Sequence, residues 1–246
     1  MVFAHGFGCD QNMWRYVSPV FEEEFRVVLF DYPGHGGTRP PISEADRYTT
    51  LSAYAQDLLS VCRELELAEV TFVGHSVSAM IGVLAEIEEP ERFAKLVLLG
   101  PSPCYTNDPP YAGGFSESDI EELLESLESN YLGWSSAMAP VIMGNNDRPE
   151  LGAELEASFC RTDPEMAHRF ARATFLSDNR EDLKRVTTPS LVLQCTNDAI
   201  APVAVGEFVC DAIPDCSLVL LDATGHCPHL SKPDATAAAI ADFVGG

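Results

Sequence analysis

Short apolar runs alternate along the chain with stretches whose apolar residues recur every three or four positions. The runs are continuous, which is typical of strands in a parallel sheet covered on both faces. They predict strands at Val2–Ala4, Arg26–Phe30, Val70–Val73, Lys95–Leu99, Ser190–Gln194 and Leu218–Leu221. The other pattern predicts helices at residues 51–65, with Thr50 as N-cap, at Val77–Ile87 and at Asp234–Val244. Such alternation predicts an open, mostly parallel, doubly wound α/β sheet.

The alternation stops between residues 101 and 183, where no strand pattern is visible. Prolines and glycines mark an irregular entry, and amphipathic stretches follow. These predict helices at Glu117–Tyr131, Trp134–Met143, Glu150–Cys160 and Pro164–Leu176. We therefore expect an α/β core from residues 1–100 and 184–246, with residues 101–183 as a helical insertion over the carboxyl edge of the sheet.

Composition and charge narrow the classes of function. The 246 residues are 46% hydrophobic and 22% charged, an ordinary globular balance. Acidic residues number 38 against 15 basic ones, for a net charge of −23 that repels nucleic-acid phosphates and anionic lipid. No apolar run is long enough to span a membrane, and the first residues lack a basic, apolar leader. We expect a cytoplasmic protein whose eight irregularly spaced cysteines are reduced thiols.

One predicted strand runs directly into a turn rich in glycine and serine. Residues 74–78 read Gly-His-Ser-Val-Ser and are followed by a helix of small residues. This pattern is one residue away from Gly-x-Ser-x-Gly, the nucleophile elbow, whose sharp turn exposes a serine at the rim of the sheet. Gly74 and the small Ser78 suit the crowded positions beside such a serine. We predict that Ser76 is a nucleophile; the alternative is a strand-to-helix turn with a chance serine.

A serine hydroxyl needs a base, and the base needs an orienting acid. After an elbow, the acid comes next in the chain and the histidine last. Asp198 follows the strand at residues 190–194, and His226 lies in the loop after the strand at residues 218–221. Both belong at the same sheet edge as Ser76. Asp222 and Asp108 are rival acids, one very close to His226 in sequence and the other at the entry of the insertion.

Acyl transfer also needs donors for the developing oxyanion. A glycine-rich loop, His5-Gly6-Phe7-Gly8, follows the first strand, so we expect the backbone amides of Phe7 and Val77 to form the oxyanion hole. A dinucleotide-binding loop is the rival interpretation, but the third glycine of Gly-x-Gly-x-x-Gly is missing. His5, His75 and His229 are expected to be structural, hydrogen-bonded to loop backbone.

The segment His226-Cys227-Pro228-His229 is the one Cys/His cluster in the sequence. A zinc site there would need a second pair of ligands, which the sequence does not offer nearby. We therefore expect no metal and no cofactor.

These motifs resemble the α/β-hydrolases grouped around the bacterial stress regulator RsbQ and the plant strigolactone and karrikin receptors. The resemblance runs nearly end to end, including the insertion. It rests on residues 5–14, 72–82, 100–105, 113–115 and 225–230. Residues 103–105 and 227–229 are more similar to RsbQ, whereas residues 77–80 are more similar to the plant receptors.

The resemblance implies a V-shaped, four-helix lid over an apolar pocket above the serine. The pocket residues that it implies are Phe7, Phe115, Trp134, Met138 and Phe175. For Phe159 and Phe170 we prefer a place in the lid core. It also implies slow hydrolysis of small hydrophobic esters or butenolide-type lactones, and for RsbQ-type proteins a PAS-domain phosphatase as partner.

One departure from the family concerns the first strands. Family members have two strands before the strand that ends at His-Gly, whereas four residues precede His5 here. We therefore expect a sheet without those two strands, in which the strand at Arg26–Phe30 is an exposed edge.

Two functions remain open. The leading hypothesis is a serine hydrolase in which Ser76 attacks, His226 is the base and Asp198 orients it. The alternative is a signalling protein that senses a small ligand and activates a partner, with slow hydrolysis. Both use the same three residues. A serine at the elbow argues against dehalogenase and epoxide hydrolase chemistry, which need an aspartate there. The complete triad argues against a non-catalytic binder.

Overall fold

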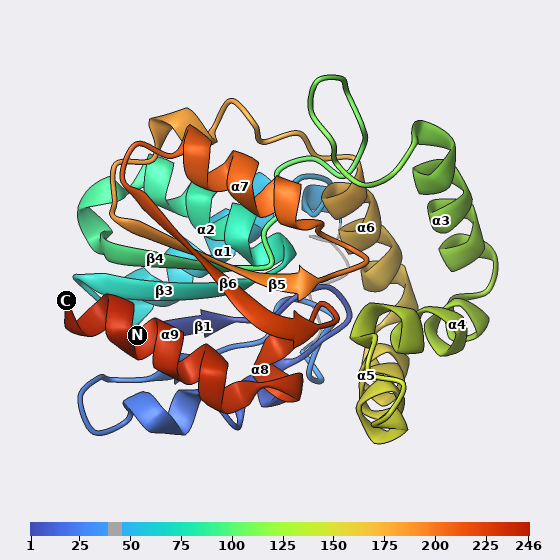
Figure 1. The fold of residues 1–246 in the computed structure, drawn as a ribbon, viewed down its shortest axis with the longest axis horizontal. Coiled ribbons are helices and arrows are strands. Elements are labelled where there is room, and N and C mark those ends of the chain that lie inside the picture. The colour runs from blue at the N-terminus through green and yellow to red at the C-terminus, as the bar shows by residue number, and fades with distance from the viewer. Residues whose placement is uncertain (39–45) are drawn as a thin grey trace.

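A six-stranded parallel sheet forms the centre of the computed structural model, which describes residues 1–38 and 46–246 (Figure 1). The strand order is β2-β1-β3-β4-β5-β6, so the first two strands lie at one edge and the last strand at the other. The strands are β1 (Val2–Ala4), β2 (Val28–Leu29), β3 (Val70–His75), β4 (Phe93–Leu99), β5 (Ser190–Asn197) and β6 (Cys216–Thr224). The predicted α/β class is confirmed, with every predicted strand present.

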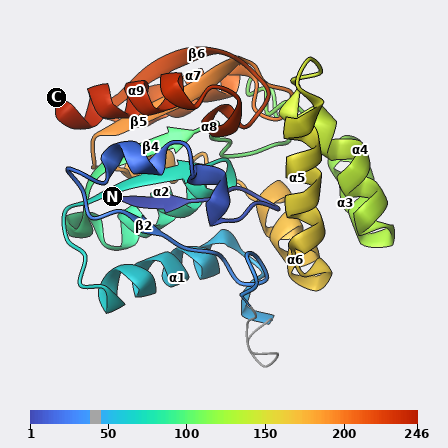
Figure 2. The ribbon, with the colours of Figure 1, turned by 90° about the horizontal axis from the view of Figure 1, so that it is seen from below.

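Apolar side chains on both faces of the sheet are buried, which explains the continuous hydrophobic runs. On one face, Phe72 and Leu98 belong to a buried cluster that also contains residues of helices α1 (Leu51–Glu64), α2 (Val77–Glu88) and α7 (Val203–Ala212). On the other face, Val73 and Leu99 belong to a second cluster. That cluster includes residues from η1 (Gln11–Trp14), η2 (Ser18–Phe21) and α9 (Pro233–Gly245). Figure 2 shows the strands between α1 on one side and α9 on the other.

Four helices are inserted between β4 and β5, as the sequence predicts: α3 (Glu117–Ser129), α4 (Tyr131–Met143), α5 (Pro149–Arg161) and α6 (Pro164–Phe175). The strand arrows point toward them, so the insertion lies beyond the carboxyl edge of the sheet (Figure 1). Its apolar residues form a third cluster together with Cys9, Met13 and Leu230 from the core. The insertion is therefore packed onto the loops that follow the strands.

The two edges of the sheet differ from expectation in extent. The ladder of β2 covers only Val28 and Leu29 of the predicted Arg26–Phe30, and among the described strands β2 pairs with β1 alone, at the edge as expected. At the opposite edge, β6 is longer than predicted and leaves Val219 and Leu220 exposed. The length of each ladder depends on the hydrogen bonds that the neighbouring strand supplies, and local hydrophobicity does not predict these bonds.

Helix α7 and the short elements η1, η2, η4 (Pro90–Arg92), η5 (Leu183–Arg185) and α8 (Pro228–Ser231) were not anticipated. Thr50 does occupy the N-cap position of α1, but its side chain makes no capping hydrogen bond. In the described part of the chain, no helix has the length and apolar character needed to cross a membrane.

Candidate active site

The turn after β3 holds Ser76 in a strained backbone conformation. Its φ of 57° and ψ of −122° lie in a region that non-glycine residues rarely adopt, and α2 begins at the next residue. The Ser76 amide donates to the carbonyl of Leu99 at 2.8 Å, which fastens the turn to β4. A Cβ on Gly74 would lie 2.6 Å from the carbonyl oxygen of Ser78. The glycine is therefore required by the turn.

Ser78, the residue that replaces the second glycine of the elbow motif, has a structural function. Its buried hydroxyl donates to the carbonyl of His5 and contacts the Tyr32 hydroxyl at 3.0 Å. The first of these bonds joins α2 to the loop after β1. Ser78, which stands where the motif has a glycine, thus links the start of α2 to the loop that lies beside Ser76.

Three side chains from three loops form a continuous hydrogen-bonded chain. The Nε2 atom of His226 lies 2.8 Å from the Oγ atom of Ser76, and its Nδ1 atom lies 2.7 Å from the Oδ2 atom of Asp198. All three side chains are largely buried. The parallel strands β3, β5 and β6 end at the same edge, and this explains how residues 76, 198 and 226 meet.

The orientation of Asp198 is fixed by backbone amides. Its Oδ1 atom accepts hydrogen bonds from the amides of Ile200 at 2.8 Å and Ala201 at 3.2 Å, which leaves Oδ2 for His226. The rival acids are engaged elsewhere: Asp222 is exposed on β6, and Asp108 forms an ion pair with Arg180 at 2.9 Å. The histidine therefore faces Asp198.

The glycine-rich loop after β1 lies directly against the elbow. Ala4 pairs with Gly74 in the sheet, and Phe7 and Val77 each lie three residues after their member of this pair. A Cβ on Gly6 would lie 2.6 Å from Nδ1 of His75 and 3.2 Å from Cβ of Ser76. The absence of a side chain at position 6 therefore lets the two loops approach. Val77 is the first residue of α2, where backbone amides have no acceptor within the helix.

The other buried histidines near the site are held in different ways. Both ring nitrogens of His5 contact backbone groups, as expected, and Nε2 of His75 donates to the carbonyl of His226 at 2.8 Å. The expectation for His229 was wrong, because neither of its ring nitrogens has a hydrogen-bond partner among the described residues. Burial lowers the pKa of His5 to about 4 and that of His229 to about 3, and it lowers the pKa of His75 well below its usual value.

A narrow apolar cavity lies over Ser76 and His226, between the sheet edge and the insertion. The part of it that the centre of a water molecule can occupy is about 40 Å³, room for only a few waters. Its walls combine residues of the core loops with residues of the four inserted helices. The lining residues are Phe7, Cys9, His75, Ser76, Tyr105, Leu123, Trp134, Met138, Ile142, Leu155, Phe159, Thr174, Phe175, Ile200, His226 and Cys227.

The structure places four of the five expected pocket residues, Phe7, Trp134, Met138 and Phe175, on the cavity wall. Phe115 is the exception and needs correction: it is not a lining residue, and its ring lies 6.5 Å from that of Tyr105, which is one.

Phe159 also differs from expectation, because it lines the cavity and its ring lies 5.4 Å from that of Trp134. Phe170 is a buried core residue, but it lies in the cluster on the sheet face and not in that of the inserted helices, with its ring tilted and centred 4.4 Å from that of Tyr54. Helical periodicity identifies the apolar face of an inserted helix, but it does not say which part of that face borders the cavity.

Comparison with known proteins gives consistent matches over the whole chain. Residues 1–239 match the model of the alpha/beta hydrolase family. A strigolactone esterase of Pisum sativum is 39% identical, over 95% of this chain and 88% of the relative. The karrikin insensitive 2 receptor CA of Petunia hybrida is 38% identical, over 95% and 87%. The solved structure of a hydrolase from Oleispira antarctica superposes with a TM-score of 0.96 at 40% identity, covering 100% of this chain and 90% of that one.

Proposed function

Because the chain belongs to the alpha/beta hydrolase family, we propose that it is a serine hydrolase that cleaves a small apolar ester or lactone at Ser76. The observation that carries this proposal is the hydrogen-bonded chain from Asp198 through His226 to Ser76, which ends beneath an apolar cavity. Nucleophile, base and orienting acid stand in the order that acyl transfer by a serine requires.

In the first half of the reaction, the hydroxyl oxygen of Ser76 attacks the substrate carbonyl while Nε2 of His226 takes its proton. Asp198 keeps the other ring nitrogen protonated and stabilises the imidazolium that forms. The backbone amides of Phe7 and Val77 donate to the oxyanion of the tetrahedral intermediate. The leaving alcohol receives the proton from His226, which leaves an acyl group on Ser76.

In the second half of the reaction, a water molecule takes the place of the leaving alcohol, and His226 removes a proton from it. The hydroxide attacks the acyl carbonyl, a second tetrahedral intermediate collapses, and Ser76 regains its proton as the acid product leaves. For a lactone, alcohol and acid remain in one molecule, so the ring opens without loss of a fragment. No step uses a group from outside the chain other than substrate and water.

The lining of the cavity supports a small, uncharged substrate. Aromatic and aliphatic side chains predominate, and none of the described lining residues is a lysine or an arginine that would attract a carboxylate or phosphate. The free volume is small, so a substrate larger than a few atoms requires the lining side chains or the inserted helices to move. The strigolactone esterase among the relatives suggests a butenolide-type lactone as one substrate class.

The test is a screen of short-chain aryl esters and butenolides with wild-type protein and Ser76→Ala. We expect wild type to turn over at least one substrate and to gain the mass of the acyl group in intact-protein mass spectrometry. Ser76→Ala should form no adduct and should keep only the roughly 10³–10⁴-fold acceleration that binding and oxyanion stabilisation provide. Full turnover by a purified Ser76→Ala sample would show that Ser76 is not the nucleophile.

A second candidate function is ligand sensing with slow hydrolysis, and the similarity to a protein named as a karrikin insensitive 2 receptor favours it. The partner that the resemblance to RsbQ suggests is a PAS-domain phosphatase. Single-turnover and multiple-turnover rates separate the two functions. A protein that acylates quickly but releases its product over hours suits a sensor, whereas fast repeated turnover suits a metabolic hydrolase.

A further inference from the structure

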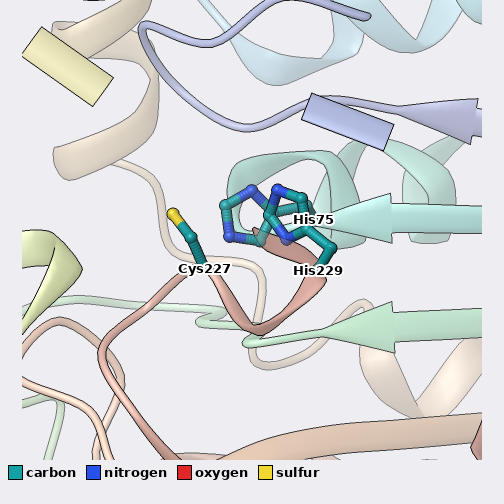
Figure 3. A group of neighbouring side chains, drawn as sticks. All are labelled: His75, Cys227 and His229. Atoms are coloured by element: carbon teal, nitrogen blue, oxygen red, sulfur yellow. The ribbon is translucent and has the colours of Figure 1, made fainter. Parts of the chain in front are cut away.

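Three potential metal ligands meet behind the candidate active site, although the sequence shows only two of them close together. His75 ends β3 and directly precedes Ser76, whereas Cys227 and His229 follow His226 at the start of α8. One ligand atom from each residue lies within 4.8 Å of the other two, and all three residues are buried. Figure 3 shows the two imidazole rings side by side and the Cys227 sulfur next to them.

The ring nitrogens of this cluster lack partners. Neither Nδ1 nor Nε2 of His229 forms a hydrogen bond within the described residues, and the same holds for Nδ1 of His75. His229 is 0% exposed, so no bulk water replaces the missing partners. Buried imidazole nitrogens are nearly always paired, and an unpaired one calls for an ordered water or an ion. The cluster therefore contains imidazole nitrogens with unused binding capacity.

The surroundings of the two histidines suit metal binding in particular. Nε2 of His75 donates to the carbonyl of His226, so the lone pair of that imidazole is on Nδ1, which has no hydrogen-bond partner among the described residues. Histidine ligands of metals usually show this arrangement, in which the second ring nitrogen donates to a carbonyl and fixes the ring. The ring of His229 is stacked 4.7 Å from that of Trp14, which fixes its plane.

We propose that His75, Cys227 and His229 form a binding site for one zinc-like divalent cation. Two imidazole nitrogens and a thiolate are a ligand set that zinc prefers, whereas magnesium and calcium require oxygen ligands that this set does not contain. Tetrahedral zinc would hold these atoms ~3.3–3.6 Å apart, so shifts of roughly 1 Å close the cluster around the ion. His75 and Cys227 also line the apolar cavity, so the proposed ion site borders the space above Ser76.

A bound ion joins two segments that carry the proposed catalytic groups. His75 precedes the nucleophile and Cys227 follows the base, so the ion cross-links the backbone of the elbow to that of the histidine loop. This consequence does not depend on whether Ser76 is the nucleophile, because the three ligands lie outside the triad. A Ser76→Ala protein should bind the ion as wild type does.

The experiment uses Co²⁺ as a spectroscopic probe and Zn²⁺ as competitor on the full chain, previously dialysed against a chelator. We expect a single equivalent of Co²⁺ to give a thiolate-to-cobalt charge-transfer band with intense visible bands of a four-coordinate site, both removed by Zn²⁺. Cys227→Ser should abolish the charge-transfer band. It should also weaken Zn²⁺ binding by more than the ~10–100-fold that loss of a ligand-orienting group costs.

The matched control is Cys9→Ser, because Cys9 is also a buried thiol on the cavity wall but does not belong to the three-residue cluster. This variant should keep the charge-transfer band. His229→Phe, which retains an aromatic ring beside Trp14, should lose metal binding while circular dichroism shows a folded protein. A wild-type protein that takes up no metal from excess Zn²⁺ would overturn the proposal and leave a buried water as the partner of His229. A band that survives Cys227→Ser would overturn it too.

Discussion

Replacing Asp198 by asparagine tests the proposed role of the acid with little change in shape. The carboxylate accepts two backbone hydrogen bonds at Oδ1, from Ile200 and Ala201, and faces His226 with Oδ2. In Asp198→Asn, the side-chain oxygen keeps the two amides, and the NH₂ group then faces Nδ1 of His226. That nitrogen must accept instead of donate, so the ring proton moves to Nε2, and His226 is unable to take the proton of Ser76.

The loss expected from this wrong tautomer is about 10⁴-fold in kcat, as in serine-protease triads, which corresponds to about 5.5 kcal/mol of transition-state stabilisation. The assay is the steady-state hydrolysis of an aryl ester, with melting temperatures to show that both variants are folded. The matched control is Asp222→Asn, a neighbouring exposed acid without a bond to His226, which should stay within a few-fold of wild type. If Asp222→Asn is the crippled variant and Asp198→Asn is nearly normal, the assignment of the acid is wrong.

Further predictions concern the loop after β1, the cavity and the buried histidines. Gly6→Ala places a Cβ 2.6 Å from Nδ1 of His75, so the loop must shift; we expect kcat to fall about 10²-fold with little change in KM, and an unchanged kcat would refute the close approach. Trp134→Ala should change KM across a series of acyl chain lengths and lower stability by about 3–5 kcal/mol; a stability loss without any change in KM would limit Trp134 to a packing role. Burial lowers the pKa of His35 to about 3. Below pH 6.5 the unfolded chain therefore binds a proton at His35 that the folded chain does not bind, so the free energy of unfolding decreases as the pH falls from about 6.5 to about 3. His35→Asn should therefore reduce the slope of unfolding free energy against pH, measured by urea titrations between pH 6 and 5, by up to about 1.4 kcal/mol per pH unit, and an unchanged slope would contradict the burial argument.

Local sequence determined the secondary structure that carries the proposed triad. Strand β3, the turn at Ser76 and helix α2 follow from an apolar run, a glycine and small residues within a single stretch of chain. The positions of Asp198 and His226 after successive apolar runs were enough to place them at one sheet edge, because parallel strands end on the same side. The choice between Asp198 and Asp222 followed from the same reasoning. These inferences depend on periodicities within about ten residues.

The tertiary structure decided everything that depends on which side of an element faces which neighbour. Phe115 and Phe159 both lie in apolar surroundings of the insertion, but only Phe159 lines the cavity, because the packing of α5 on the core turns it inward, whereas Phe115 precedes α3 and pairs with Thr106. Likewise, Cys227 and His229 are an incomplete ligand pair in sequence. The loop after β6 reaches His75 at the end of β3, about 150 residues away, although β4 and β5 lie between these two strands in the sheet. The hydrophobic pattern states that a residue is buried, whereas its contacts depend on segments distant in the chain, and a single sequence holds no local signal for them.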